Sequence, residues 1–386
     1  MSVVLVMAVG FVGYRVLQKH NNQSSPAITS QKQLAPPGKG GPAQANLASC
    51  STGALYSVSP IKLDKLSYIL ALGNFNPLPS DHLYFVITRG NNNANDNVPT
   101  ETVNLYSPGD VTVFQIGRQI RTTNGIADNT DYYFSFAPCR EVSATFGHVS
   151  SLGGPLSEIG FKNCDKPYSI GNGSLYQHCT SEVSIKVKAG ELIGTAGGKA
   201  SVALDFSNDD TRIPKPYVAN PNHNYDLTAT CAIDYYQGAL KASLQSLLSH
   251  GQVGSSLASG CGKIFQDKKG TLQGDWYYGT AQQANSDITR QLALVHENYN
   301  PSIGAISVGG TITQRSEWQF TPTHSGNINR EFSEVTPGTT IYCYQDPQMS
   351  GRILIQLVSA TNINIEEQSS QCSDNIAFSK PYNYQR

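Results

Sequence analysis

The chain has 386 residues, of which 39% are apolar and 14% are charged, and its net charge is −1 at pH 7. A charge this close to zero excludes the strongly basic surface that nucleic-acid-binding domains present, so no nucleic-acid partner is expected. The length favours two domains, and the abundance of Tyr, Gly, Ser, Thr and Asn is typical of β-rich exported proteins.

The N-terminal segment is apolar. Residues 2–13 (SVVLVMAVGFVG) carry no charge, and the run is at the short limit for crossing a bilayer, which takes about 20 residues. We predict an uncleaved transmembrane anchor over 1–18, with a cleaved signal peptide as the alternative. Residues 19–49 are rich in Pro, Gly, Ser, Gln and Ala, which predicts a disordered tether. The protein is therefore expected to be membrane-anchored and extracytoplasmic, at a cell surface or in a periplasm.

The eight cysteines all follow the predicted tether, and their number is even. In an exported chain this predicts disulfides rather than a metal site, and no C-x-x-C pair is present. Their spacing favours the pairs Cys164–Cys179, Cys231–Cys261, Cys343–Cys372 and Cys50–Cys139.

The first globular region, 50–210, is rich in β-branched and aromatic residues that alternate with polar ones. This pattern predicts an all-β barrel or sandwich without a long helix, followed by a Pro- and Asn-rich linker over 211–226. The predicted strands are 82–90, 101–109, 110–120, 131–139, 141–149, 183–197 and 201–207.

Five segments of this region follow an order known from one enzyme family. They are SDHLYF (80–85), SPGDVTVF (107–114), ATFGHVSSL (144–152), VKAGELIGTAGG (187–198) and VALDF (202–206). Over residues 80–206 the chain resembles the LytM or lysostaphin type of peptidoglycan endopeptidase, whose fold contains a duplicated hybrid motif. The resemblance implies a β-barrel with a zinc site, and peptidoglycan or another cell-envelope glycan or protein as the partner.

The zinc-ligand motifs of that family, H-x-x-x-D and H-x-H, are both incomplete here. Val86 stands four residues after His82, and no two histidines are separated by one residue. The positions that keep a candidate ligand are His82, His148 and Asp205, and His148 is the candidate catalytic residue if the protein is an enzyme. We therefore expect a catalytically inactive binding or scaffold module without a cofactor. The alternative is an active zinc endopeptidase with an altered His and Asp ligand set, which requires these side chains to converge within about 4–5 Å.

The second region, 227–386, predicts an antiparallel β domain with one or two short helices. Apolar residues at three- and four-residue steps predict helices within 232–250 and 285–298. The predicted strands are 271–279, 305–314, 316–322, 330–335, 339–345, 352–360 and 362–368.

Aromatic residues give the second region two further interpretations. Gly274-Asp275-Trp276 resembles the G-x-W motif of lipocalin-type barrels, which implies a small apolar ligand inside the barrel as a second alternative function. Exposed aromatic side chains would instead form a surface that stacks on a glycan or a partner protein, or they fill the core. The candidates for this binding surface are Trp276, Trp318, Tyr342 and Tyr344.

Overall fold

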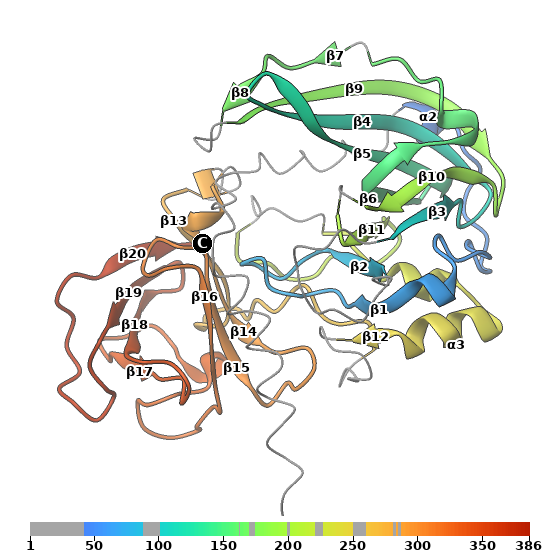
Figure 1. Ribbon diagram of the computed structural model, residues 1–386. Coiled ribbons are helices and arrows are strands. Elements are labelled where there is room, and N and C mark those ends of the chain that lie inside the picture. Colours follow the sequence, from blue (N-terminus) through green and yellow to red (C-terminus); the bar gives the residue numbers. More distant parts are fainter. Residues whose placement is uncertain are drawn as a thin grey trace, which may run out of the picture.

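The chain forms two β-sheets that follow one another in the sequence (Figure 1). The computed structural model describes residues 42–87, 101–161, 163–169, 174–198, 201–220, 227–249, 260–280, 283–284 and 287–386. None of the helices in these ranges has the length and apolar character needed to cross a membrane. The predicted anchor over 1–18 lies outside the described residues, and so does the predicted tether up to residue 41.

The last part of the predicted tether is in contact with the first sheet. It contains a short helix, α2 (Pro42–Ala45). The buried Gln44 donates a side-chain hydrogen bond to the Arg140 carbonyl at 3.1 Å, and the Arg140 amide donates to the Ala48 carbonyl at 3.0 Å. These contacts and the Cys50–Cys139 disulfide hold residues 44–50 at the turn between two strands of the sheet.

The first sheet positions the candidate site, and its central strands run in the order β2, β11, β6, β5, β4, β9 with antiparallel neighbours. The long strands β4, β5 and β9 form one side of the sheet (Figure 1). In the described residues it comprises β1 (Leu66–Leu70), β2 (His82–Ile87), β3 (Thr102–Tyr106), β4 (Val111–Thr123), β5 (Ile126–Cys139), β6 (Val142–Leu152), β7 (Asn163–Cys164), β8 (Tyr168–Ser169), β9 (Ser174–Val187), β10 (Leu192–Gly197), β11 (Ala203–Asp210) and β12 (Leu248–Ser249).

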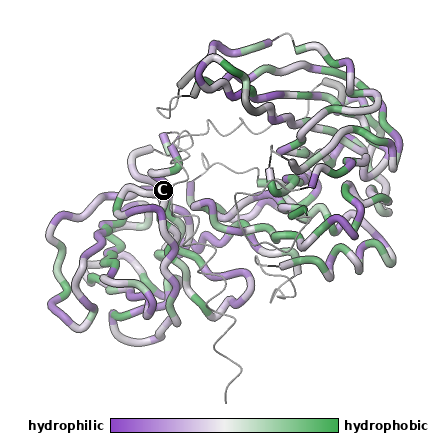
Figure 2. Tube along the Cα trace, in the orientation of Figure 1, coloured by the Kyte–Doolittle hydropathy of each residue, from purple (hydrophilic) through white to green (hydrophobic). Residues whose placement is uncertain are grey.

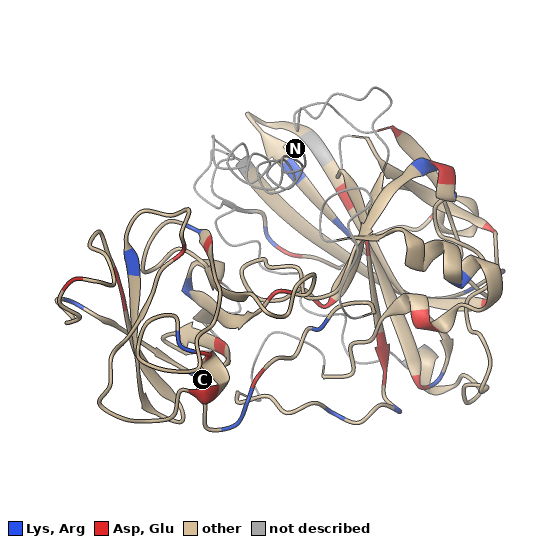
Figure 3. Ribbon diagram, turned by 90° about the horizontal axis from the view of Figure 1, so that it is seen from below, with Lys and Arg blue, Asp and Glu red and all other residues tan. Residues whose placement is uncertain are grey.

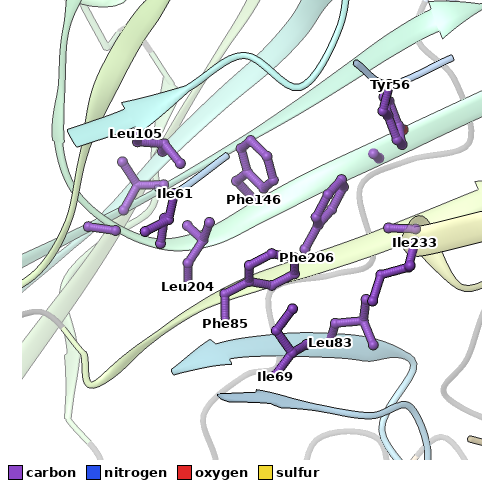
Figure 4. Close-up of a cluster of buried hydrophobic side chains, with 14 of the residues drawn as sticks. Tyr56, Ile61, Ile69, Leu83, Phe85, Leu105, Phe146, Leu204, Phe206 and Ile233 are labelled. Carbon is purple, nitrogen blue, oxygen red and sulfur yellow. The ribbon is translucent and has the colours of Figure 1, made fainter. Parts of the chain in front are cut away.

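One face of this sheet forms the first core. Alternate residues of β2 and β11 are buried, and hydrophobic and hydrophilic residues interleave along the strands (Figure 2). The ring centroid of Phe206 lies 4.7–6.3 Å from those of Phe85, Phe136 and Phe146. Figure 4 shows Phe206 beside Phe85 and Phe146. The opposite face of β2 and β11 is only partly covered, and the candidate site lies there.

The first core extends past the predicted linker. Buried residues of 231–248, together with Ile264, pack into the same hydrophobic cluster as β2 and β11. The helix predicted within 232–250 is present as η3 (Ala232–Tyr235) and α3 (Gly238–Ser246), and it is shorter because Leu248 and Ser249 pair with β1 as a parallel strand.

The second sheet has only antiparallel neighbours and is nearly closed, like a barrel, in the order β16, β15, β14, β13, β20, β19, β18, β17. This confirms the predicted second antiparallel β domain. Its strands in the described residues are β13 (Gly274–Tyr278), β14 (Gln291–His296), β15 (Gly304–Val308), β16 (Ser316–Phe320), β17 (Tyr342–Tyr344), β18 (Arg352–Ser359), β19 (Asn362–Gln368) and β20 (Tyr382–Gln385).

The helix predicted over 285–298 is wrong, because this segment contains strand β14 after the single turn η4 (Ile288–Arg290). Leu292 and Leu294 point into the second core, whereas Ala293 and Val295 pack in a separate cluster with Leu78 of the first domain. A strand that is buried on both faces has no polar alternation, so its apolar residues fit a helical spacing equally well.

The strand predicted over 330–335 is also wrong. Residues Phe332–Glu334 form the 3-10 turn η5, and the Glu331 carboxylate accepts a hydrogen bond from the Ser333 amide at its start. Side-chain capping of this kind favours a turn over an extended strand. Phe332 is fully buried in the second core, so one apolar side chain of the segment still faces inward.

All four predicted disulfides are confirmed: Cys50–Cys139, Cys164–Cys179, Cys231–Cys261 and Cys343–Cys372. Disulfides in this number suggest an oxidising, extracytoplasmic environment. Charged side chains of both signs are scattered over both sheets (Figure 3), in keeping with the net charge of −1.

Candidate functional site

The three sequence-derived candidates, His82, His148 and Asp205, lie together on the partly covered face of the first sheet. They come from neighbouring strands, because β11 with Asp205 lies between β2 with His82 and β6 with His148. Along β11, Leu204 and Phe206 are buried in the core, and Asp205 therefore points to the opposite face. The same alternation in β2 places His82 and Tyr84 on this face.

A β-bulge in β6 directs His148 toward Asp205. Phe134 pairs with Phe146 and Tyr132 pairs with Val149, so β6 contains one more residue than β5 between these pairs. His148 lies in this extra length and has a φ of 57°, a left-handed conformation that non-glycine residues seldom adopt. Bulges of this kind redirect side chains and are frequent beside active sites.

Gly147 provides the space that Asp205 occupies. The two residues are directly opposite each other in the β6–β11 pairing. A Cβ atom at position 147 would lie 3.3 Å from the Asp205 Cβ and 3.4 Å from its Oδ2. Glycine at this position therefore leaves the carboxylate room beside the bulge.

The Asp205 Oδ2 atom lies between the two imidazoles. It is 3.7 Å from Nε2 of His82 and 3.5 Å from Nε2 of His148. Two ligands of a tetrahedral zinc ion with bonds near 2 Å stand about 3.4 Å apart, so both distances suit a His and Asp pair on one ion.

Each imidazole is held from its other nitrogen by a second carboxylate. Nδ1 of His82 is 2.8 Å from Oδ1 of Asp81, and Nδ1 of His148 is 2.8 Å from Oδ2 of Asp131. A carboxylate at Nδ1 accepts the proton of that nitrogen and orients the ring with Nε2 as the outward atom. Metal-binding histidines are commonly supported in this way.

The carboxylates control the protonation of both histidines. The charge of Asp205 is the main cause that raises the pKa of His148, to about 10, and the hydrogen bond to Asp131 adds to this against the opposing effect of burial. Burial lowers the pKa of His82, but Asp205 and Asp81 together outweigh it and the net shift is upward. In the metal-free state His148 is therefore a cation that is paired with two carboxylates.

This raised pKa predicts how stability depends on pH. Because the folded-state pKa of His148 lies above its ordinary value of 6.5, its ion pairs contribute fully below pH 6.5 and are lost as the pH rises toward about 10. We expect the difference in unfolding free energy between metal-free wild type and His148→Asn to shrink from pH 6.5 to pH 10 in urea denaturation. Asparagine tolerates the positive φ, and a difference that grows with pH would contradict the assignment.

The exposure and the donor set of the site suit a metal ion. The side chains of His82, His148 and Asp205 remain 22%, 33% and 20% exposed, so a ligand can reach them. Oδ2 of Asp205 faces both imidazoles, whereas its Oδ1 is buried and has no hydrogen-bond partner among the described residues. Two imidazoles and a carboxylate are a donor set that suits zinc.

The two imidazoles stand apart in the metal-free geometry. Within the described residues, the single group of three ligand atoms that all lie within 4.8 Å of one another is Cys50, Cys139 and Glu141, whose cysteines are joined as a disulfide. Since each histidine is within 3.7 Å of Asp205, the distance that exceeds 4.8 Å is the one between His82 and His148. The three side chains therefore do not converge within the roughly 4–5 Å that a zinc site requires, and one shared ion would need the two rings to move closer around Asp205 and to lose their Nε2 protons.

Sequence reasoning missed three residues of this site: Asp81, Asp131 and Tyr84. Tyr84 packs on His82, with ring centroids 4.5 Å apart, and burial together with the charge of Asp205 raises the pKa of its hydroxyl. The adjacency of Asp81 to His82 was a usable signal. Asp131 gave none, because it is 17 residues from His148 in the sequence.

The aromatic candidates of the second region lie mostly inside the barrel. Trp276, Trp318 and Tyr344 are 0%, 3% and 1% exposed, whereas Tyr342 is half-buried. The Arg386 guanidinium stacks on Trp276 at 4.1 Å and donates to the carbonyl of Gln273 at 2.9 Å. The three buried rings fill the second core and present no stacking surface to a glycan.

Comparisons of the chain with protein-family models, with curated proteins and with solved structures returned no match.

Proposed function

We propose that this protein is an extracytoplasmic zinc-dependent hydrolase of cell-envelope peptides, with His82, His148 and Asp205 as the metal ligands. The observation that carries the proposal is the placement of the Asp205 carboxylate between two imidazoles, each held at Nδ1 by its own carboxylate. A zinc ion with an open position supplies a Lewis acid that lowers the pKa of a bound water to about 7.

The chain's own residues have separate tasks in this proposal. Asp81 and Asp131 hold the Nδ1 protons, which leaves each Nε2 as the metal donor after deprotonation. Asp205 supplies the anionic ligand that compensates the charge of the ion. The substrate class, peptides of the cell wall, comes from the resemblance to the LytM type and from the oxidising environment that the disulfides suggest.

The competing function is the inactive binding or scaffold module. In that interpretation the five side chains form an ion-pair network without metal, and the protein binds peptidoglycan without cutting it. The carboxylates at both Nδ1 atoms favour the metal, because they orient both Nε2 atoms toward the Asp205 Oδ2 atom, as second carboxylates do for metal-binding histidines. Membrane attachment through residues 1–18 stays a prediction in both cases.

Zinc analysis of the purified full chain separates the two functions. We expect about one zinc per chain after loading and dialysis, lost in His82→Ala and kept in His324→Ala, since His324 is an exposed histidine paired with Glu334 in the second domain. We also expect release of soluble peptides from purified peptidoglycan, abolished by a chelator and restored by zinc. Zinc binding without peptide release would contradict the proposed hydrolase activity. Absence of bound zinc would favour the inactive binding module.

A further inference from the structure

A cation from the second domain reaches the surroundings of the candidate site. Arg315 precedes β16, and its guanidinium donates a hydrogen bond to the side-chain oxygen of Asn76 in the first domain. The Asn76 side chain also hydrogen-bonds the hydroxyl of Tyr84, whose ring packs on His82. Arg315 is thus linked to the ring of a proposed metal ligand by three contacts, through Asn76 and Tyr84.

The loop that Arg315 contacts is packed against the second domain. Asn76 belongs to the loop 71–81 between β1 and β2, which the Gly73 and Ser80 amides close through backbone hydrogen bonds of 2.8 Å. The side chain of Asn298, from the second domain, donates to the Leu72 carbonyl at 3.1 Å and accepts from the Lys263 amide at 2.8 Å. Leu78 of the same loop packs against Tyr277, Ala293 and Val295.

Arg315 has no carboxylate partner among the residues that the structure describes, where its guanidinium hydrogen-bonds Asn76 and interacts electrostatically with Tyr84. Arg315 is exposed, yet desolvation by the surrounding protein lowers the pKa of its guanidinium. An exposed guanidinium that has no carboxylate partner among the described residues can bind an anionic ligand group.

We propose that Arg315 binds a carboxylate of the substrate, so that the zinc site of the first domain and a cation of the second domain hold one peptide between them. This inference rests on the proposed function and names its substrate class: a peptide with a free carboxylate on the side that faces the second domain. The planar fork of the guanidinium matches a carboxylate through two parallel hydrogen bonds.

Two peptide hydroxamates that differ in one group test the inference. Both compounds carry a hydroxamate that binds zinc. The opposite end of the peptide is a free carboxylate in the first compound and an amide in the second. Each is made with a short series of spacer lengths between its two ends. Binding to the zinc-loaded full chain is measured by calorimetry. We expect the carboxylate form to bind at least about tenfold more tightly at the best spacer length.

The variants assign this preference to one side chain. Arg315→Gln is expected to remove the preference while the affinity for the amide form and the zinc content stay unchanged. Arg315→Lys keeps the positive charge but loses the planar guanidinium, so it should retain part of the preference for the carboxylate form. Lys380→Gln removes an exposed cation elsewhere in the second domain and should retain the full preference. Equal binding of both forms by the wild type, or a preference that persists in Arg315→Gln, overturns the role of Arg315 but not the proposed function. A chain that binds no zinc overturns the proposed function as well.

Discussion

Asp205→Asn is expected to lower zinc affinity by more than about 100-fold, the largest effect of any single substitution at the site. Asparagine has nearly the same shape but no negative charge, so the ion loses its anionic ligand and both imidazoles lose the group they face. Changes in groups that only support a ligand typically cost 10–100-fold, and loss of a ligand costs more. Competition with a chromogenic zinc chelator measures the change.

A variant at an exposed aspartate outside the site controls for the loss of one negative charge in Asp205→Asn. Asp110 is exposed and paired with Lys188, and Asp110→Asn removes one carboxylate without touching the site, so zinc affinity should stay at the wild-type value. Asp131→Asn should give an intermediate loss of about 10–100-fold, because it weakens only the support of His148. Equal affinity of Asp205→Asn and Asp110→Asn would mean that the carboxylate does not bind the ion.

The candidate ligands could be named from the sequence, and Asp81 could have been found beside His82, but Asp131 could not. His82, His148 and Asp205 were identified because they occupy positions in a known order of segments. Asp131 acts on His148, which lies beside it only because β5 and β6 are neighbours and because the bulge in β6 turns His148 toward the site. Pairing between strands that are distant in the sequence is not encoded in any local pattern.

Sequence patterns predicted the disulfides correctly but predicted a helix where β14 lies. Three of the four pairs join cysteines 15 to 30 residues apart, so sequence proximity was sufficient to find them, and Cys50–Cys139 followed by elimination. The segment 291–296 was mistaken for a helix because Leu78 and its neighbours in the first domain cover the outer face of β14. Burial of both faces comes from domain contact, which a pattern within one segment does not record.

Phe206→Ala is expected to lower the free energy of unfolding by about 3–5 kcal/mol, because it removes a large buried ring and leaves a cavity. Phe206 is 1% exposed, and its ring contacts those of Tyr56, Phe85 and Phe146 at centroid distances of 4.7–5.8 Å. It also neighbours Asp205 on β11, so it holds the strand that carries the central ligand. Urea denaturation of the metal-free chain, with the disulfides intact, measures the loss.

The matched control is Ile126→Ala at the start of β5, where the side chain is 70% exposed and little apolar area is removed from the core. Its unfolding free energy should stay within about 0.5 kcal/mol of wild type. If Phe206→Ala is equally mild, the core beneath β11 does not hold the strand. If it is destabilised as expected but still folded, its zinc affinity should also fall, because Asp205 then lies on a strand whose buried face is no longer packed.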